Sequence, residues 1–343
     1  MSNLHINNHY IPKCYLKRWE DSNHQICVYK TLVNHESVPL WKKYFSTAIA
    51  YHKHLYTHVV AGKESDELEK WFDSKYESPG NIVLEKVLLN QKLTVKDWNI
   101  LVNFLAVQDV RTPSRLYAHL QHCKEFLPEI LKSTLQKLNN KLENEKSIDV
   151  ADHEALVQNT STFPLKVTTI PFSSLKGGLL KVETYSGRGS WIYSIKYVLE
   201  NISKILHSYK WSIVKPAKGF KWLTCDNPVV RLNFRDYQDY DLKGGWGNNK
   251  GNIFFPISPD HAMFVQIGDK PYPKGTILTV DQTMFFRKIV IENANRLIFA
   301  DTIDDDVIKI CPRTVDSNKF KNEQIQLANW HEFNKQLELE YYK

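Results

Sequence analysis

The sequence predicts an α+β protein in which an N-terminal helical half packs on a mainly antiparallel sheet and a C-terminal helix follows. Apolar residues recur at helical spacing between about residues 62 and 145, strand-like segments follow after Phe163, and an amphipathic segment lies near the end of the 343 residues. Helices followed by strands, rather than alternating with them, favour the α+β class. We expect residues 1–160 (an N-terminal anchor segment and helical subdomain) and 161–343 (a mixed subdomain with the C-terminal helix) to pack as one unit.

The first sixty residues lack helical periodicity. Residues 10–60 are expected to be irregular, with short strands such as 25–29. The stretch from His9 to Trp19 nevertheless carries several large apolar or aromatic side chains, which are costly to leave in water. We therefore expect this segment to dock on the body of the protein instead of forming a polar tail.

Helical signals begin after residue 62. An apolar stripe over residues 68–76 predicts one helix, and Pro79 fits the first turn of the next. Residues 94–97 resemble a capping box, with Asp in place of the usual Glu, and predict that a helix begins there. Thr112-Pro113 should bend or interrupt this helix, and a further helix is expected at about 124–145.

The second half has the texture of a sheet. Short runs of β-branched and aromatic residues lie between turn residues at 165–170, 211–214, 221–224, 229–232, 253–255 and 263–267. Helices are expected to interrupt these strands at about 191–209 and 281–295. A last amphipathic helix is expected at about 322–339.

Composition indicates the cellular compartment and the charge of possible partners. Five cysteines without a C-x-x-C pair favour a reducing compartment, and no apolar run is long enough to span a bilayer. We therefore expect a cytoplasmic protein with no membrane partner. The formal net charge of +7 favours a polyanionic partner without requiring one, because the basic residues are scattered.

Two clusters give weaker signals. Residues 204–222 combine five lysines with four aromatic residues, which is typical either of solvated lysines on strands or of a platform that stacks single-stranded nucleic acid; we favour the first interpretation. His52, His54 and His58 have metal-like spacing, but no cysteine or acidic residue completes a zinc pattern around them.

Several short motifs occur together in this chain. They are His9-Tyr10-Ile11-Pro12 with Tyr15-Leu16 and Trp19, then Glu69 and Glu77, Gln108-x-x-Arg111-Thr112-Pro113, Thr224-Cys225-Asp226-Asn227-Pro228, and Pro256-Ile257-Ser258-Pro259. Over roughly residues 9–300 the chain resembles the bacterial domain-of-unknown-function family 4238. The resemblance implies a shared fold and a site located at these motifs. It also implies genes in variable bacterial genome regions, as expected of a defence or stress effector.

His9 is the leading candidate for proton transfer or metal ligation. Histidine is the only side chain that titrates near neutral pH without a perturbing neighbour. The alternative is a buried imidazole that hydrogen-bonds to the backbone and anchors the N-terminal segment. Residue type alone supports both interpretations.

Three carboxylates are candidate metal ligands. Glu69 and Glu77 are eight residues apart, about 80° around a helix, so both can face one groove. With Asp226 they could hold a divalent ion, Mg²⁺ or Mn²⁺, as in phosphodiester hydrolysis. The alternative is a pair of glutamates on a solvated helix.

Gln108 and Arg111 share the face of a helix that is otherwise apolar. A guanidinium there requires an anion, which could be a glutamate of the preceding helix, Asp226 or a bound phosphate. Asp226 and Asn227 lie between two predicted strands, where they serve either as an Asx-turn or as displayed site residues.

Two hypotheses of function are consistent with these residues. In the first, the polar residues of the motifs converge in a cleft between the two halves as a phosphate-handling hydrolytic site, that of a metal-assisted nuclease or nucleotide phosphodiesterase. In the second, the same residues form a buried network, and the chain is a non-catalytic module that binds a protein or nucleic acid. Accessibility separates the two, because a site must be open to its substrate. The residues concerned are His9, Glu69, Glu77, Gln108, Arg111, Asp226 and Asn227.

Overall fold

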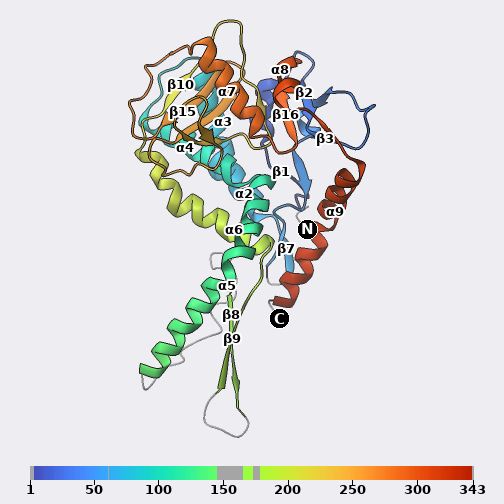
Figure 1. Cartoon of the computed structure of the whole chain (residues 1–343), viewed down its shortest axis with the longest axis vertical. Helices are drawn as coiled ribbons and strands as arrows, with labels where there is room; N and C mark the ends of the chain where they lie inside the picture. Colours follow the sequence, from blue (N-terminus) through green and yellow to red (C-terminus); the bar gives the residue numbers. More distant parts are fainter. Residues whose placement is uncertain (1–3, 61, 145–164, 173–177, 342–343) are drawn as a thin grey trace.

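Two antiparallel sheets and the helices packed on them form the body of the protein, and a long arm extends from it (Figure 1). The computed structural model describes residues 4–60, 62–144, 165–172 and 178–341. The arm consists of helix α5 (Pro113–Asn144) and a hairpin of β8 (Leu165–Pro171) and β9 (Gly178–Thr184). Helices and mainly antiparallel sheets confirm the predicted α+β class.

The helices of the N-terminal half begin close to their sequence signals. Helix α2 (Glu67–Phe72) continues through a π-helical turn (Asp73–Glu77) into α3 (Ser78–Leu88). Thr94 caps α4 (Val95–Val110) in the predicted capping box. The break at Thr112-Pro113 is also confirmed, but the helix predicted from about residue 124 already begins at Pro113, because proline is well tolerated in the first turn.

The first sheet has five antiparallel strands in the order β10-β15-β14-β12-β13. They are β10 (Ser212–Val214), β12 (Val230–Phe234), β13 (Tyr240–Asp241), β14 (Asn252–Ser258) and β15 (His261–Gln266). The central strand β14 is buried along its whole length. Four of the predicted strand segments lie in this sheet.

The second sheet joins strands from both ends of the chain, in the order β11-β16-β2-β4. They are β2 (Gln25–Lys30), β4 (Trp41–Phe45), β11 (Thr224–Cys225) and β16 (Leu297–Ala300). Residues 10–60 are therefore more regular than predicted, and β16 was missed. Because this sheet combines strands from residues 1–160 and 161–343, the two predicted subdomains share it.

Shorter elements complete the body. The remaining strands are β1 (Asn7–His9), β3 (Leu32–Val33), β5 (Tyr51–Lys53), β6 (His58–Val60), β7 (Lys63–Ser65) and β17 (Thr314–Val315). The remaining helical elements are α1 (Lys13–Leu16), η1 (Lys17–Trp19), η2 (Ser46–Ala48), α6 (Arg188–Tyr197), η5 (Val198–Ile202), η6 (Ser203–Ser208), α7 (Val280–Glu292), α8 (Asp305–Ile310) and α9 (Ser317–Tyr341). Only β3 and β17 pair in parallel among the named strands of the described residues.

The N-terminal segment docks in the core, as predicted. Ile11, Tyr15, Leu16 and Trp19 are each 0% exposed. The Tyr15 ring stacks on Phe255 of β14 at a centroid distance of 5.3 Å. Its hydroxyl lies 2.7 Å from both the Thr224 hydroxyl and the Pro256 carbonyl, and it donates to the carbonyl. This segment therefore connects the helical layer to both sheets.

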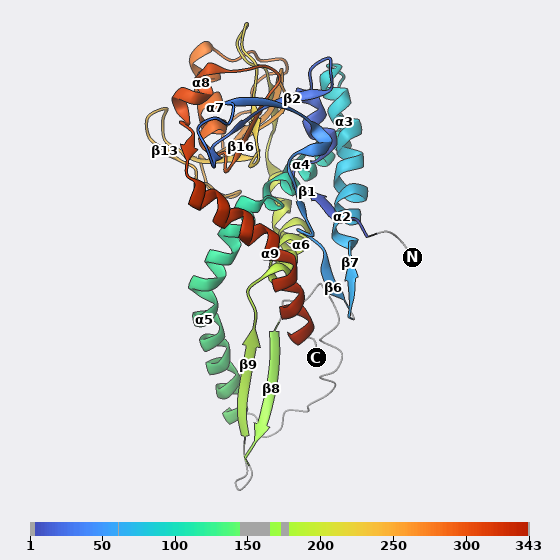
Figure 2. The same ribbon diagram turned by 90° about the vertical axis from the view of Figure 1, so that its right-hand side faces the viewer.

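The C-terminal helix α9 runs along the body beside β6 and α6 (Figure 2). A buried ion pair fixes it: Arg188 donates from Nε and Nη2 to the two carboxylate oxygens of Glu338, at 2.9 and 2.6 Å. Glu338 also accepts from the amide of Val59, and Asn334 accepts from the amide of Arg188. Within the described residues, no helix combines the length and apolar character needed to cross a bilayer.

Candidate functional site

A polar pocket of about 590 Å³ lies where β1, α1 and α2 meet, and we call it the Glu69 pocket. His9 reaches it from β1, and Glu69 and Glu77 reach it from α2 and the π-helical turn that follows. Two exposed lysines, Lys13 and Lys17, also line it. Three of the predicted site residues therefore share one pocket with two exposed lysines beside them.

Arg111 is fully buried next to the Glu69 pocket. Its guanidinium donates to Oε1 of Glu77 and to the backbone carbonyl of His9, and its Cζ lies 4.6 Å from the centroid of the Phe72 ring. Of the anions considered from the sequence, its partner is thus a glutamate from the preceding helical segment. Because Arg111 is 0% exposed, it acts as a positioning residue that holds His9 and Glu77 in place.

The surroundings of Glu69 in this pocket raise the pKa of its carboxyl group. Burial raises its pKa to about 7; the charge of Glu77 also raises the pKa, whereas Arg111 lowers it. Its Oε2 atom is buried and has no hydrogen-bond partner among the described residues. A carboxyl group that exchanges a proton near pH 7 is suited to general acid–base chemistry.

His9 behaves differently from the expectation based on residue type. Burial lowers its pKa to about 4, and the positive charge of Lys13 lowers it further. Its Nε2 atom has no hydrogen-bond partner among the described residues, and its ring lies 5.4 Å from that of Tyr51 on the paired strand β5. His9 is therefore a neutral imidazole at neutral pH. The pKa near 7 that was expected of His9 belongs to Glu69.

Arg111→Lys is expected to lower the free energy of unfolding by about 1–3 kcal/mol, because an ammonium group cannot reproduce the two contacts of the guanidinium. Urea unfolding measures the change. The control is Arg235→Lys, at an exposed Arg235–Asp239 pair, where the expected change is within about 0.5 kcal/mol. Equal stability of the two variants would contradict the positioning role of Arg111.

The structure separates Asp226 from the two glutamates, so the predicted three-carboxylate metal site is wrong. Asp226 lies in another pocket, of about 520 Å³, which Tyr10 also lines. Its carboxylate accepts from the backbone amides of residues 295, 296 and 297 at 2.8, 2.7 and 3.1 Å. Burial nevertheless raises its pKa to about 6, and these amides lower it. The carboxylate thus accepts the hydrogen bonds of the backbone amides at the start of β16. Its oxygens are not within ligand distance of those of Glu69 and Glu77.

The other predicted catalytic residues, Asn227 and Gln108, are both buried. Asn227 accepts from the hydroxyl of Thr112 at 3.4 Å and donates to the carbonyl of Asn293 at 3.3 Å, which ties the end of α4 to the end of α7. Gln108 is 0% exposed, and neither its Oε1 nor its Nε2 has a partner within the part of the chain that the structure describes. Neither residue lines the Glu69 pocket.

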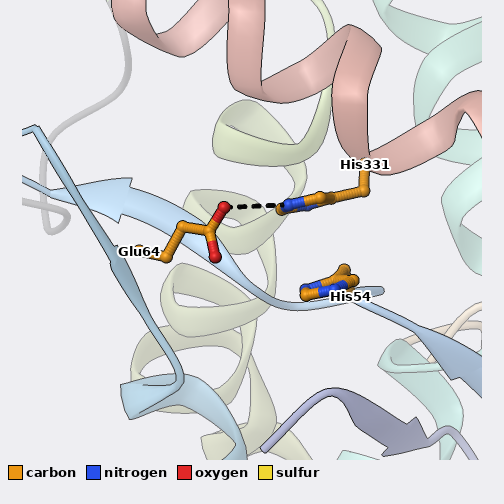
Figure 3. Close-up of side chains that lie close together, drawn as sticks. All are labelled: His54, Glu64 and His331. Atoms are coloured by element: carbon orange, nitrogen blue, oxygen red, sulfur yellow. Dashed lines mark hydrogen bonds and ion pairs between the residues drawn. The ribbon is translucent and has the colours of Figure 1, made fainter. Parts of the chain in front are cut away.

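His54, Glu64 and His331 form the one group of possible metal ligands that the described residues bring together (Figure 3). Arg188 donates to Nδ1 of His331 at 2.9 Å, so His331 carries its proton on Nε2 and donates it to Glu64 at 3.1 Å. Lys335 also donates to Glu64, at 2.8 Å. A protonated Nε2 cannot ligate a metal, and the charges of Arg188 and Lys335 repel a cation. The contacts of this group instead fasten α9 to the body. Spacing in the sequence drew attention to His54 but gave no signal for Glu64 or His331.

Comparison with known proteins identifies one family. The chain matches DUF4238, described as a protein of unknown function, over residues 7–304. No curated protein and no solved structure matches the chain. The matched region contains both sheets and all the residues that line the Glu69 pocket except His5. The chain therefore belongs to the DUF4238 family.

Proposed function

We propose that the protein hydrolyses phosphodiester bonds of a nucleic acid or nucleotide at the Glu69 pocket. The observation that carries this proposal is the presence of two carboxylates in different environments: Glu77 is the ion-pair partner of Arg111, whereas Glu69 has a pKa of about 7. A pair of acidic groups in different environments is typical of acid–base catalysis. In this proposal, Glu69 moves the proton and Glu77 provides fixed negative charge.

Lysines beside the pocket support a phosphate-bearing substrate. Lys13 and Lys17 are exposed and line the pocket next to His9, where their ammonium groups are placed to bind phosphoryl oxygens. His9, whose imidazole is uncharged at pH 7, offers a hydrogen bond to the substrate or to the attacking water. The positive net charge of the chain favours the approach of such a substrate.

A divalent ion fits this proposal with fewer protein carboxylates than the three predicted from the sequence. Mg²⁺ is commonly bound by one or two protein carboxylates together with substrate phosphates and water. Glu77 would hold Mg²⁺ or Mn²⁺ in this way together with the substrate phosphates, which leaves Glu69 to move the proton, and the ion would stabilise charge that develops on the phosphoryl oxygens. Asp226 has no part in it.

The non-catalytic alternative is favoured by a different observation. Arg111, Asp226 and Asn227 are at most 5% exposed, and their polar groups are engaged with other parts of the chain. A binding module could use such a network to shape a surface for a protein or nucleic-acid partner. Activity assays separate this alternative from the hydrolase, because only the hydrolase depends on the proton of Glu69.

Glu69→Gln is expected to lower the rate of phosphodiester hydrolysis at least about 100-fold, the contribution typical of a general acid or base. The assay uses single-stranded and double-stranded DNA, RNA and nucleotides, with Mg²⁺ or Mn²⁺ and with a chelator. Glu67→Gln is the matched control, since Glu67 is exposed on the same helix and does not line the pocket. No cleavage of any substrate by the parent protein would leave the binding module as the function.

The same variant has a pH signature in stability. Glu69 has a pKa of about 7 in the folded protein and about 4.5 when unfolded, so its contribution to stability is present at low pH and is lost as the pH rises through 7. Glutamine does not ionise, so Glu69→Gln is expected to melt at a higher temperature than the parent at pH 8, and the gain should shrink at pH 5. Thermal melts at both pH values test this sign. A gain that is equal at both values would contradict the raised pKa.

We also propose that the protein acts in the cytoplasm as a bacterial effector in defence or stress. All five cysteines are free thiols, which fits a reducing compartment. A nuclease or nucleotide phosphodiesterase would suit the effector role that resemblance to the family suggests. Measurement of nucleotide pools and DNA integrity in bacteria expressing the parent and Glu69→Gln proteins tests this role.

A further inference from the structure

A second cavity lies on the body between the helical layer and the five-stranded sheet. It has a volume of about 270 Å³, and we call it the Trp98 pocket. One wall comes from the loop after α3 and the start of α4, and the other comes from β10, the start of β15 and residues 271–275. It shares no lining residue with the Glu69 pocket. Junctions between layers of a fold are common places for small-molecule sites.

The charge of the Trp98 pocket has one sign. Lys92, Lys215 and Lys274 line it, and its lining residues in the described chain include no aspartate or glutamate. Lys215 donates to the side chain of Asn90 at 3.0 Å, which orients one ammonium group at the wall. Lys92 and Lys274 are exposed on opposite walls. Three ammonium groups in a lining that contains no carboxylate favour an anionic ligand.

Aromatic rings supply the rest of the wall. Trp98, Trp211 and Tyr272 line the pocket, and Trp98 and Tyr272 are partly exposed. The indole of Trp211 already donates to the carbonyl of Leu206, so its remaining contribution is apolar. Rings of this kind stack on the faces of nucleic-acid bases. The basic and aromatic segment at 204–222 therefore contributes Trp211 and Lys215 to a defined cavity.

His261 gives an independent indication of a ligand site. It lines the pocket and is 5% exposed, and its Nε2 atom is buried with no hydrogen-bond partner among the described residues. Its Nδ1 atom lies 3.2 Å from the Ser258 hydroxyl. A buried polar atom without a partner is costly, and the hydrogen-bonding edge of a bound heterocycle would satisfy it.

We infer that the Trp98 pocket binds a single nucleotide, with the base among the aromatic rings and next to His261, and the phosphate at Lys92, Lys215 and Lys274. The volume of about 270 Å³ lies just below the range of about 300–1,000 Å³ typical of small-molecule sites, so the pocket has room for no more than one nucleotide. This site is separate from the Glu69 pocket. It does not depend on the proposed hydrolytic activity.

Titration calorimetry of the full chain with AMP, GMP, CMP and UMP tests the inference. At least one nucleotide is expected to bind saturably, and at least about tenfold more tightly than its nucleoside or inorganic phosphate at the same salt concentration. Lys92→Glu with Lys274→Glu should weaken this binding at least about tenfold, since both substitutions replace an attractive charge at the phosphate by a repulsive one. The matched control, Lys218→Glu with Lys270→Glu, makes the same change in charge at exposed lysines outside the pocket and should bind like the parent.

Two further measurements locate the site. Glu69→Gln should bind the nucleotide as the parent does; loss of binding in this variant alone would assign the nucleotide to the Glu69 pocket and overturn the inference. In the parent protein, bound nucleotide should protect Lys92 and Lys274 from an amine-reactive reagent, with Lys218 and Lys270 unchanged. Absence of saturable binding up to millimolar nucleotide, or equal labelling of all four lysines, would also overturn it.

Discussion

Deletion of residues 1–20 is expected to give insoluble protein or to lower the melting temperature by more than about 10 °C. The deletion removes four fully buried apolar side chains, Ile11, Tyr15, Leu16 and Trp19. At about 1.5–3 kcal/mol each, their burial is worth roughly 6–12 kcal/mol as an upper estimate, comparable with the total stability of about 5–15 kcal/mol typical of a protein. Solubility and thermal melting measure the outcome.

A single substitution in the same segment is expected to have a smaller effect than the deletion. Tyr15→Phe keeps the stacked ring but leaves the Thr224 hydroxyl and the Pro256 carbonyl without their partner. It is expected to cost about 1–3 kcal/mol and to leave the protein folded. A truncated protein that melts like the full chain would show that the docked segment is dispensable.

Glu338→Ala is expected to lower the free energy of unfolding by about 3–5 kcal/mol. The substitution leaves Arg188 as a buried cation without its carboxylate, and an unpaired buried charge is far more costly than a missing pair. Glu340→Ala, at an exposed position on the same helix, is the matched control and should change stability by less than about 0.5 kcal/mol. Denaturant unfolding of the two variants is the measurement.

A double substitution tests the physical reason for that loss. Arg188→Met with Glu338→Leu removes both charges and fills a similar volume, so it should recover part of the stability lost in Glu338→Ala. A double variant that is less stable than Glu338→Ala would contradict the explanation by unpaired charge. Equal melting of Glu338→Ala and Glu340→Ala would show that the ion pair does not fasten α9.

Local signals in the sequence were sufficient for much of the fold. The capping box at Thr94, the proline break at Thr112-Pro113 and the strand of residues 253–255 depend on neighbours within a few positions, and each was found close to its predicted place. Strand β16 was missed because its four residues become a strand only by pairing with β2 and β11. That pairing is set by tertiary contacts, which periodicity does not report.

Only part of the candidate site was predicted, because the sequence shows local spacing but not tertiary contacts. The spacing of Glu69 and Glu77 was enough to suggest a shared groove, and both line one pocket. Burial, which a sequence does not display, lowers the pKa of His9 and raises that of Glu69. Asp226 was misplaced because its position at a strand end does not reveal that backbone amides occupy its carboxylate.

The family match ends at residue 304, whereas α9, which supplies Glu338 to Arg188, begins at Ser317. The region that matches the family is thus shorter than the structure, which includes α9. A relative that keeps an arginine at the position of Arg188 requires an acidic residue from a segment beyond the shared region, and a relative without that segment requires a neutral residue there. Across the family, these two positions should therefore covary, and the arginine should be gained or lost together with its C-terminal helix.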